Sequence, residues 1–166
     1  MGKPPTDADV NSEVNPCLSI RELPNFPTRA RDRKKIMVLL IGGRCPALEF
    51  LVERQKSSQS EYKKLIKLLS KLAENDETPN LETIKAVGTR RQLLQLDGNK
   101  NARLYCFQED GNLVVCTSGF WIGRGNKRRN QNAEIEAAEA LMERWRNSRP
   151  VPAKPLIRSA KLESKK

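Results

Sequence analysis

The side chains of this 166-residue chain that are best suited to chemistry are cations and a tyrosine in its second half. The catalytic candidates are Arg103, Tyr105, Lys127 and Arg128. Arginine binds phosphate oxygens through paired N–H groups, and a lysine crowded by arginines can have a lowered pKa and act as a base. Tyr105 can donate or accept a proton. Such a set suits metal-free RNA cleavage, in which the 2′-hydroxyl attacks the adjacent phosphorus.

A second set is suited to holding RNA through phosphate contacts and base stacking. Its members are Arg90, Arg91, Arg124, Arg129, Phe120 and Trp121. If the strands that carry the two sets are neighbours, the sets are expected to converge at one end of a sheet. Plainer alternatives remain open, because each aromatic residue can belong to an ordinary core and residues 127–129 can form a solvated turn.

Several classes of site are excluded by composition. The chain has no histidine, which excludes Ser-His-Asp and Cys-His catalysis and removes the usual zinc and iron ligand sets. Its four cysteines form no CxxC pair, and no glycine-rich nucleotide motif is present. No metal and no small-molecule cofactor are therefore expected. Cys106 and Cys116 flank a predicted turn, and two buried, reduced thiols are favoured there over a disulfide.

The formal net charge of +11 is concentrated near the C-terminal end, where residues 121–166 hold 12 Lys and Arg against 5 Asp and Glu. Such a field favours polyanionic partners, with a solvated basic tail as the plainer alternative. The first residues lack an apolar signal core, and the longest apolar run, at 36–41, is too short to span a bilayer. The sequence therefore predicts a cytoplasmic protein without membrane contact.

Composition divides the chain into three segments. Residues 1–35 are rich in proline and are predicted to be a poorly ordered extension, although residues 18–26 can pack on the domain or dock a partner. Residues 36–149 are predicted to form the folded domain. Residues 150–166 are predicted to be a basic, flexible tail.

Hydrophobic periodicity predicts the elements of this domain. They are a strand at 36–41, helices at 47–55 and from 58 to a polar break at 74–79, strands at 93–96, 102–108 and 113–122, and a helix at 132–147. Residues 81–87 are ambiguous. The prediction is an α+β fold in which a small sheet with about three antiparallel strands is covered by helices. Alternation places Tyr105 and Phe107 on one sheet face and Leu104 and Cys106 on the other, one face meeting helices and the other a ligand.

The order and wording of residues 36–147 resemble the RelE/ParE toxin superfamily, in its HigB-like, phage-derived branch. Four matches carry the resemblance. They are Leu94-Gln95-Leu96 at a first strand, Arg103, Tyr105 and Phe107 on the next, Ser118-Gly119-Phe120 at the end of a third, and Glu134, Ile135 and Ala138 on the helix. The chain differs from the family pattern where Asp97 stands for an arginine and Ser118 for a histidine.

This resemblance implies a RelE-like fold and a toxin of a type II toxin–antitoxin system. It also implies a ribosome-dependent mRNA endoribonuclease that inhibits translation without metal, with mRNA on the ribosome and a cognate antitoxin as partners. Arg103 and the strand end at Phe120 carry over directly. The alternative is a non-catalytic basic module on the same fold that binds RNA, DNA or a protein.

Overall fold

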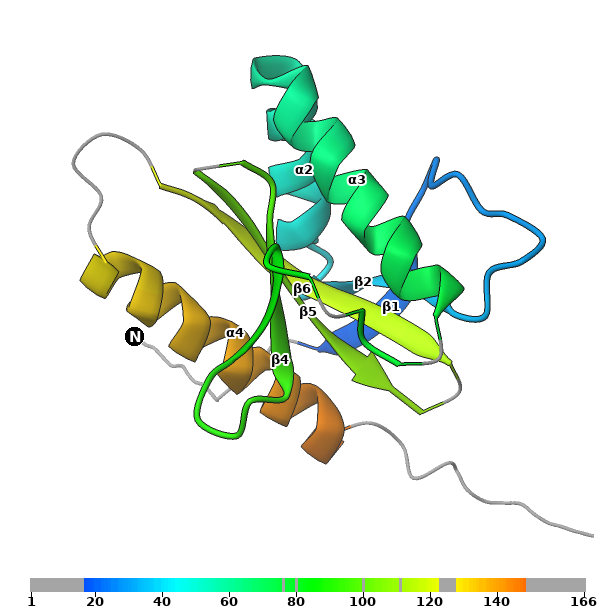
Figure 1. The fold of residues 1–166 in the computed structure, drawn as a ribbon. Coiled ribbons are helices and arrows are strands. Elements are labelled where there is room, and N and C mark those ends of the chain that lie inside the picture. Colours follow the sequence, from blue (N-terminus) through cyan, green and yellow to red (C-terminus); the bar gives the residue numbers. More distant parts are fainter. Residues whose placement is uncertain are drawn as a thin grey trace, which may run out of the picture.

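The computed structural model describes residues 17–148 apart from positions 76, 80, 100, 111 and 123–127. In this part of the chain six strands form one mixed, open sheet, and three helices cover it (Figure 1). The predicted α+β class is confirmed. The predicted small sheet of about three antiparallel strands is wrong, because the sheet has six strands and the pair β2–β6 is parallel. The predictions for residues 1–16 and 150–166 lie outside the described residues.

The sheet joins distant parts of the sequence. Its strands are β1 (Leu18–Glu22), β2 (Lys35–Ile41), β3 (Ile84–Val87), β4 (Leu93–Asp97), β5 (Ala102–Glu109) and β6 (Leu113–Trp121). Their spatial order is β1-β2-β6-β5-β4-β3, and every neighbouring pair is antiparallel except β2 with β6. The predicted β5–β6 hairpin is confirmed. Asn112 takes a φ of 61° in its turn, a conformation that asparagine tolerates.

Local sequence explains where the helices begin. Pro46 stands at the first turn of α2 (Pro46–Ser57), a position where its missing N–H costs no hydrogen bond. Ser58 caps α3 (Gln59–Glu74), because its hydroxyl accepts a hydrogen bond from the Glu61 backbone N–H at 3.4 Å. The predicted cap is confirmed. Helix α4 (Arg128–Ser148) begins four residues before the predicted helix start.

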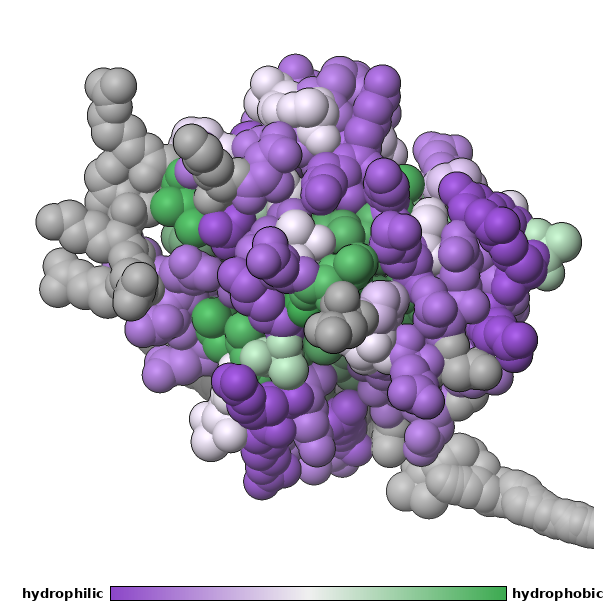
Figure 2. All heavy atoms as spheres, viewed as in Figure 1, coloured by the Kyte–Doolittle hydropathy of each residue, from purple (hydrophilic) through white to green (hydrophobic). Residues whose placement is uncertain are grey.

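Both faces of the sheet carry helices, which differs from the expectation that one face is left for a ligand. Helices α2 and α3 cover one face, and α4 covers the other (Figure 1). Leu104 and Cys106 lie in the α2/α3 core, whereas Tyr105 and Phe107 lie in the core beneath α4, as alternation predicted. The surface visible in Figure 2 is mostly hydrophilic, with hydrophobic residues showing only in small areas.

The structure contains two strands that the sequence did not predict. β1 lies in the predicted poorly ordered extension, yet it pairs with β2 along its whole length and turns Leu18 and Ile20 toward the α4 core. β3 occupies the ambiguous segment and pairs with β4. Both are short edge strands whose backbone pairing with a neighbour supplies the order that local hydrophobicity does not.

The thiols of the hairpin are buried and unbonded. Cys106 lies directly opposite Cys116, and burial raises the pKa of the Cys106 thiol to about 12. Both therefore stay protonated and behave as small apolar residues. In the described part of the chain, none of the helices is both long enough and apolar enough to cross a membrane.

Candidate functional site

A group of polar side chains lies on the α4 face at one end of the sheet. Strand register places Arg103 opposite both Asp97 and Phe120, and Tyr105 opposite both Gln95 and Ser118. Because these positions alternate along their strands, they share the face beneath α4. We call the following residues the polar cluster: Lys85, Gln95, Asp97, Arg103, Tyr105, Gln131 and Glu134.

Asp97 is the centre of the polar cluster. Its carboxylate lies 3.3 Å from Arg103 Nε and 3.1 Å from Lys85 Nζ, and it accepts a hydrogen bond of 2.9 Å from Gln95. Asp97 is only 9% exposed, so these neighbours rather than water pair with its carboxylate oxygens. Arg103 also donates to the carbonyls of Asn99 and Ala102, each at 3.0 Å. Its guanidinium is thus held in one orientation at the sheet end.

Helix α4 covers the cluster with its first turns. Gln131 Nε2 donates to Gln95 Oε1 at 3.0 Å, which is a polar contact. Further along, Ala138 and Met142 are fully buried in the same core as Phe107. The start of the helix is therefore held over the cluster by hydrogen bonding, and its middle by apolar packing.

Tyr105 is the most unusual member of the cluster. Its side chain is fully buried, and its hydroxyl has no hydrogen-bond partner among the described residues. Burial raises the pKa of the hydroxyl well above its ordinary value, the Glu134 charge adds to the rise, and the Arg103 charge opposes it. Tyr105 is therefore a protonated donor at neutral pH. The structure favours the donor role over the base role, both of which the sequence left open.

Glu134 is a site residue that sequence reasoning missed as such. It lies on the second described turn of α4, and burial raises the pKa of its carboxyl. A carboxyl with a raised pKa is poised to exchange protons nearer neutral pH than an ordinary one. Gln95, Asp97 and Lys85 were also missed, although two polar residues spaced by two in the otherwise apolar LLQLD were a usable signal.

The predicted aromatic pair lies at the same end of the sheet but divides between its two faces. Phe120, opposite Arg103, packs partly buried in the α4 core. Trp121, opposite Ala102, is 40% exposed, and its ring lies under the guanidinium of Arg54 on α2. The sequence did not predict the Arg54 contact.

Two of the predicted arginines lie elsewhere. Arg90 and Arg91 precede β4, which runs antiparallel to β5, so they are next to the far end of β5. Leu93, at the start of β4, is opposite Phe107, four residues along the strand from Arg103, or about 13 Å. Arg90 instead pairs with Glu143 on α4 at 3.4 Å. The expectation that they converge with Arg103 is therefore wrong.

The remaining predicted residues belong to the basic segment after β6. Arg124 and Lys127 lie outside the described residues. Arg128 and Arg129 are the first two residues of α4, so they follow the same sheet end as Arg103 and Phe120 in the chain. Only their backbone is described.

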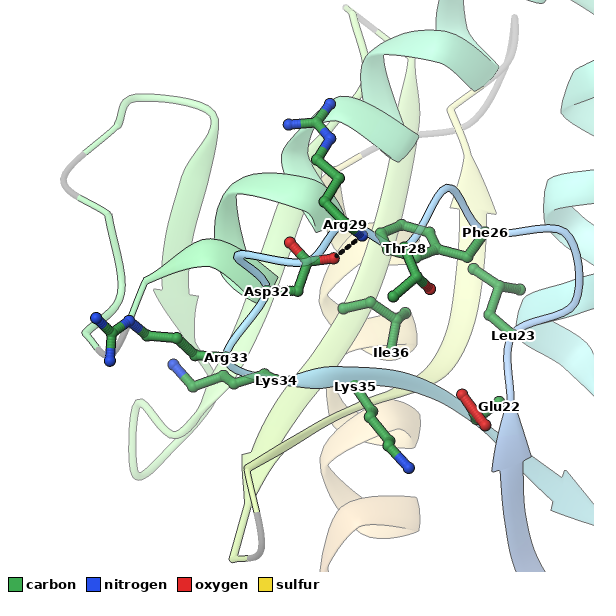
Figure 3. Close-up of a pocket in the computed structure, with 10 residues that line it drawn as sticks. All are labelled: Glu22, Leu23, Phe26, Thr28, Arg29, Asp32, Arg33, Lys34, Lys35 and Ile36. Carbon is green, nitrogen blue, oxygen red and sulfur yellow. Dashed lines mark hydrogen bonds between the residues drawn. The ribbon is translucent and has the colours of Figure 1, made fainter.

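A cavity of about 240 Å³ lies apart from the polar cluster, between the 23–35 segment and the start of β2 (Figure 3). Leu23, Phe26 and Ile36 form its apolar side, and Asp32 Oδ2 accepts a hydrogen bond of 2.9 Å from the Arg29 backbone N–H. Figure 3 shows the side chain of Arg33 extending away from it. It shares no residue with the cluster.

Comparison with models of known protein families found no match, and comparison with curated proteins found none. The geometry of the polar cluster and its surroundings is therefore the basis for assigning a function.

Proposed function

We propose that this protein is a RelE-like toxin of a type II toxin–antitoxin system that cleaves mRNA on translating ribosomes without metal. Its partners are then a cognate antitoxin and ribosome-bound mRNA. Support comes from the element order, from Arg103 and Phe120 at one sheet end, and from the basic segment that leads from this end into α4. The alternative functions, non-catalytic binding of RNA, DNA or a protein, use the same basic end of the sheet.

The observation that carries the proposal is the Tyr105 hydroxyl. Among the described residues this buried hydroxyl has no partner; such a group costs about 1–3 kcal/mol and calls for an explanation in a native structure. An RNA phosphate or leaving oxygen is an acceptor of the kind that this hydroxyl lacks. Arg103 and Glu134 both act electrostatically on this hydroxyl, and they supply the cation and the carboxyl that the same reaction needs.

Each residue then has a role in a balanced reaction. Glu134 takes the proton from the 2′-hydroxyl, the 2′-oxygen bonds to phosphorus, and the bond from phosphorus to the 5′-oxygen breaks. Tyr105 gives its proton to the departing oxygen, while Arg103 stabilises the charge on the phosphoryl oxygens. The proton on Glu134 returns to Tyr105. The products are a 2′,3′-cyclic phosphate and a 5′-hydroxyl.

RNA reaches these groups when the first turn of α4 moves away from the sheet. The Gln131–Gln95 hydrogen bond is a polar contact that water can replace. In the middle of the helix the side chains of Ala138 and Met142 are fully buried, so this part stays in place. The proposal therefore requires only local opening over the polar cluster.

The test is primer extension on a reporter mRNA in a translation extract, with and without active ribosomes. We expect discrete cuts by the wild type only when ribosomes translate. Tyr105→Phe keeps the packing and removes only the hydroxyl, so the cleavage rate should fall about 100-fold or more. The other tyrosine of the chain, Tyr62, lies on the α2/α3 side, and Tyr62→Phe is the matched control that should cleave normally.

Two outcomes would overturn the proposal. One is the absence of cuts by folded wild-type protein in a translating extract. The other is wild-type cleavage by Tyr105→Phe, which would leave the buried hydroxyl without a catalytic role.

A second candidate function is favoured by the way Arg103 is occupied. Its guanidinium is already paired with Asp97 and bonded to two backbone carbonyls, which is the arrangement of a structural residue. In that case the basic surface binds RNA or DNA without cleaving it. Salt-sensitive binding by the wild type, together with intact RNA, would distinguish this function from the first.

A further inference from the structure

The indole of Trp121 is unusual for a large apolar side chain because it is 40% exposed at the end of β6. Only one other large hydrophobic residue among the described ones, Val52 at 41%, is as exposed. Trp121 is nonetheless held in place, since the guanidinium carbon of Arg54 lies 5.2 Å from its ring centroid.

Arg54 is itself fixed from behind. Its Nη1 donates to Glu61 Oε1 at 2.9 Å, and both side chains are about nine-tenths buried, at 10% and 9% exposure. The Phe50 ring, with its centroid 6.0 Å from the guanidinium carbon, lies beside it. A buried ion pair of this kind costs desolvation and gives fixed geometry in return. It holds the guanidinium carbon of Arg54 over the ring of Trp121.

Close packing at Gly119 brings this assembly together. A Cβ added at Gly119 would lie 2.1 Å from Phe50 Cδ2, so only glycine lets α2 approach β6 so closely. This approach brings Arg54, on the last turn of α2, to the ring of Trp121. The glycine of the Ser118-Gly119-Phe120 motif thus has a local physical reason.

We propose that Trp121, backed by Arg54, stacks an unpaired nucleobase of the RNA strand whose phosphate lies at Arg103. This inference rests on the proposed function and adds a base-binding surface to its site. Trp121 is opposite Ala102, the residue next to Arg103. The side chains of Trp121 and Arg103 therefore lie at the same end of the sheet but on opposite faces. An RNA strand that crosses this end of the sheet can place a base against the indole of Trp121 and a phosphate against the guanidinium of Arg103.

The chemistry favours a nucleobase over other ligands. Bases stack on an indole face, and an indole already immobilised by a cation loses little freedom on binding. Arg54 is the positioning residue, because it contacts the indole and not the base. Since every base has a stackable face, the surface accepts any unpaired base and rejects a base-paired duplex.

The binding experiment uses the two tryptophans of the chain. In Trp145→Phe the only remaining tryptophan is Trp121, and its fluorescence reports on base stacking. The probe is a single-stranded RNA with 2′-O-methyl groups, which cannot be cleaved. We expect saturable quenching by this RNA and none by a duplex of the same sequence. Single-stranded DNA of the same sequence is the arm that separates RNA binding from general single-strand binding.

Substitutions then locate the effect. In the otherwise wild-type protein, Trp121→Ala should weaken binding of the 2′-O-methyl RNA roughly five- to a hundredfold, and Trp121→Phe should restore part of it. The matched control is Val52→Ala, which removes a side chain of equal exposure from the same helix as Arg54 and should leave affinity unchanged.

The positioning role has its own test. The double variant Arg54→Met, Glu61→Gln removes both charges together and so leaves neither buried alone. It should lower the RNA affinity and, when combined with Trp145→Phe, the fluorescence anisotropy of Trp121. A purely structural pair would change the melting temperature and leave the affinity as it was.

Unchanged affinity in Trp121→Ala, or an absence of quenching in the single-tryptophan protein, would overturn the inference. The result is separable from the proposed function, because the probe cannot be cleaved. Tyr105-dependent cuts with normal binding by Trp121→Ala would overturn only the stacking surface. Trp121-dependent binding without cuts in translating extract would overturn only the ribonuclease.

Discussion

The two faces of the sheet are built from the same strands but bury different chemistry. On the α2/α3 face, the strands contribute apolar side chains such as Leu96, Leu104 and Cys106. On the α4 face, the same strands bury Gln95 and Asp97 at one end. Alternation along β4 and β5 makes this division possible, since neighbouring residues point to opposite faces.

This difference sets apart the face on which we propose that the cleavage chemistry takes place. Apolar burial stabilises in proportion to area, whereas buried polar groups cost free energy unless they are paired. The strand residues of the α2/α3 face have the stabilising arrangement, and the buried Arg54–Glu61 ion pair of this side lies between its helices. The α4 face has Asp97 shared by two cations and a Tyr105 hydroxyl without a partner among the described residues. Groups of this kind are retained where they do more than hold the fold together.

Truncation of the apolar face should have the largest effect on stability. Leu104 is fully buried in the centre of β5, so Leu104→Ala should lower the free energy of unfolding by about 2–5 kcal/mol. Urea denaturation measures this change. Affinity for single-stranded RNA, measured well below the melting temperature, should stay the same. A loss smaller than about 1 kcal/mol would mean that this face is not the close-packed one.

Removal of Asp97 should lower stability less than Leu104→Ala does. Unlike Leu104→Ala, it should also change RNA affinity. Asp97→Ala leaves Lys85 and Arg103 without their shared carboxylate, which should cost about 1–3 kcal/mol by urea denaturation. It also releases the Arg103 guanidinium for phosphate, so RNA affinity should rise. Asp110→Ala, in the exposed β5–β6 turn, makes the same change in net charge and is the control. Equal RNA affinity for both variants would show that Asp97 does not restrain Arg103.

Local pattern was enough to predict the elements on which both faces depend. The alternation of Leu104, Tyr105, Cys106 and Phe107 is a property of one strand, and the Ser58 cap is a property of one turn. β1 could not be predicted in this way. It is a five-residue strand in a proline-rich segment, and its order comes from pairing with β2.

The candidate site was only partly predictable, because local pattern places a residue on its own strand but does not show which distant residues it meets. Arg103 and Tyr105 were found because they lie on a clear strand. The position of Arg90 depends on the direction of β4 relative to β5, which is a tertiary property. The contact of Arg54 with Trp121 joins residues far apart in the sequence, and it depends on how closely α2 approaches β6 at Gly119.

Loss of the Tyr105 hydroxyl should not lower stability. Tyr105→Phe should unfold at the same free energy as the wild type or be up to about 1–2 kcal/mol more stable, because no described hydrogen bond is lost. Thr117→Val is the contrasting variant on the neighbouring strand. Its hydroxyl donates to the Tyr105 carbonyl at 3.3 Å, so its loss should cost about 0.5–1.5 kcal/mol. If Tyr105→Phe proved the more destabilising of the two, the Tyr105 hydroxyl would have a structural partner.

The smallest expected effect is the pH dependence that Glu134 adds to stability and to the cleavage rate. Burial raises the pKa of its carboxyl, so the folded protein holds this proton more tightly than the unfolded chain does. The contribution of Glu134 to stability is therefore fully present below its unfolded pKa of about 4.3 and is lost as the pH rises through the raised folded value. Cleavage should show the opposite trend, because a base must be deprotonated, so its rate rises over the same window.

Glu134→Gln should abolish both trends, and Glu136→Gln, at an exposed position on the same helix, should retain them. Urea denaturation and cleavage assays across this pH range measure the two slopes. If stability fell with rising pH while cleavage did not rise, Glu134 would be a partly buried carboxyl of the α4 face and not the base.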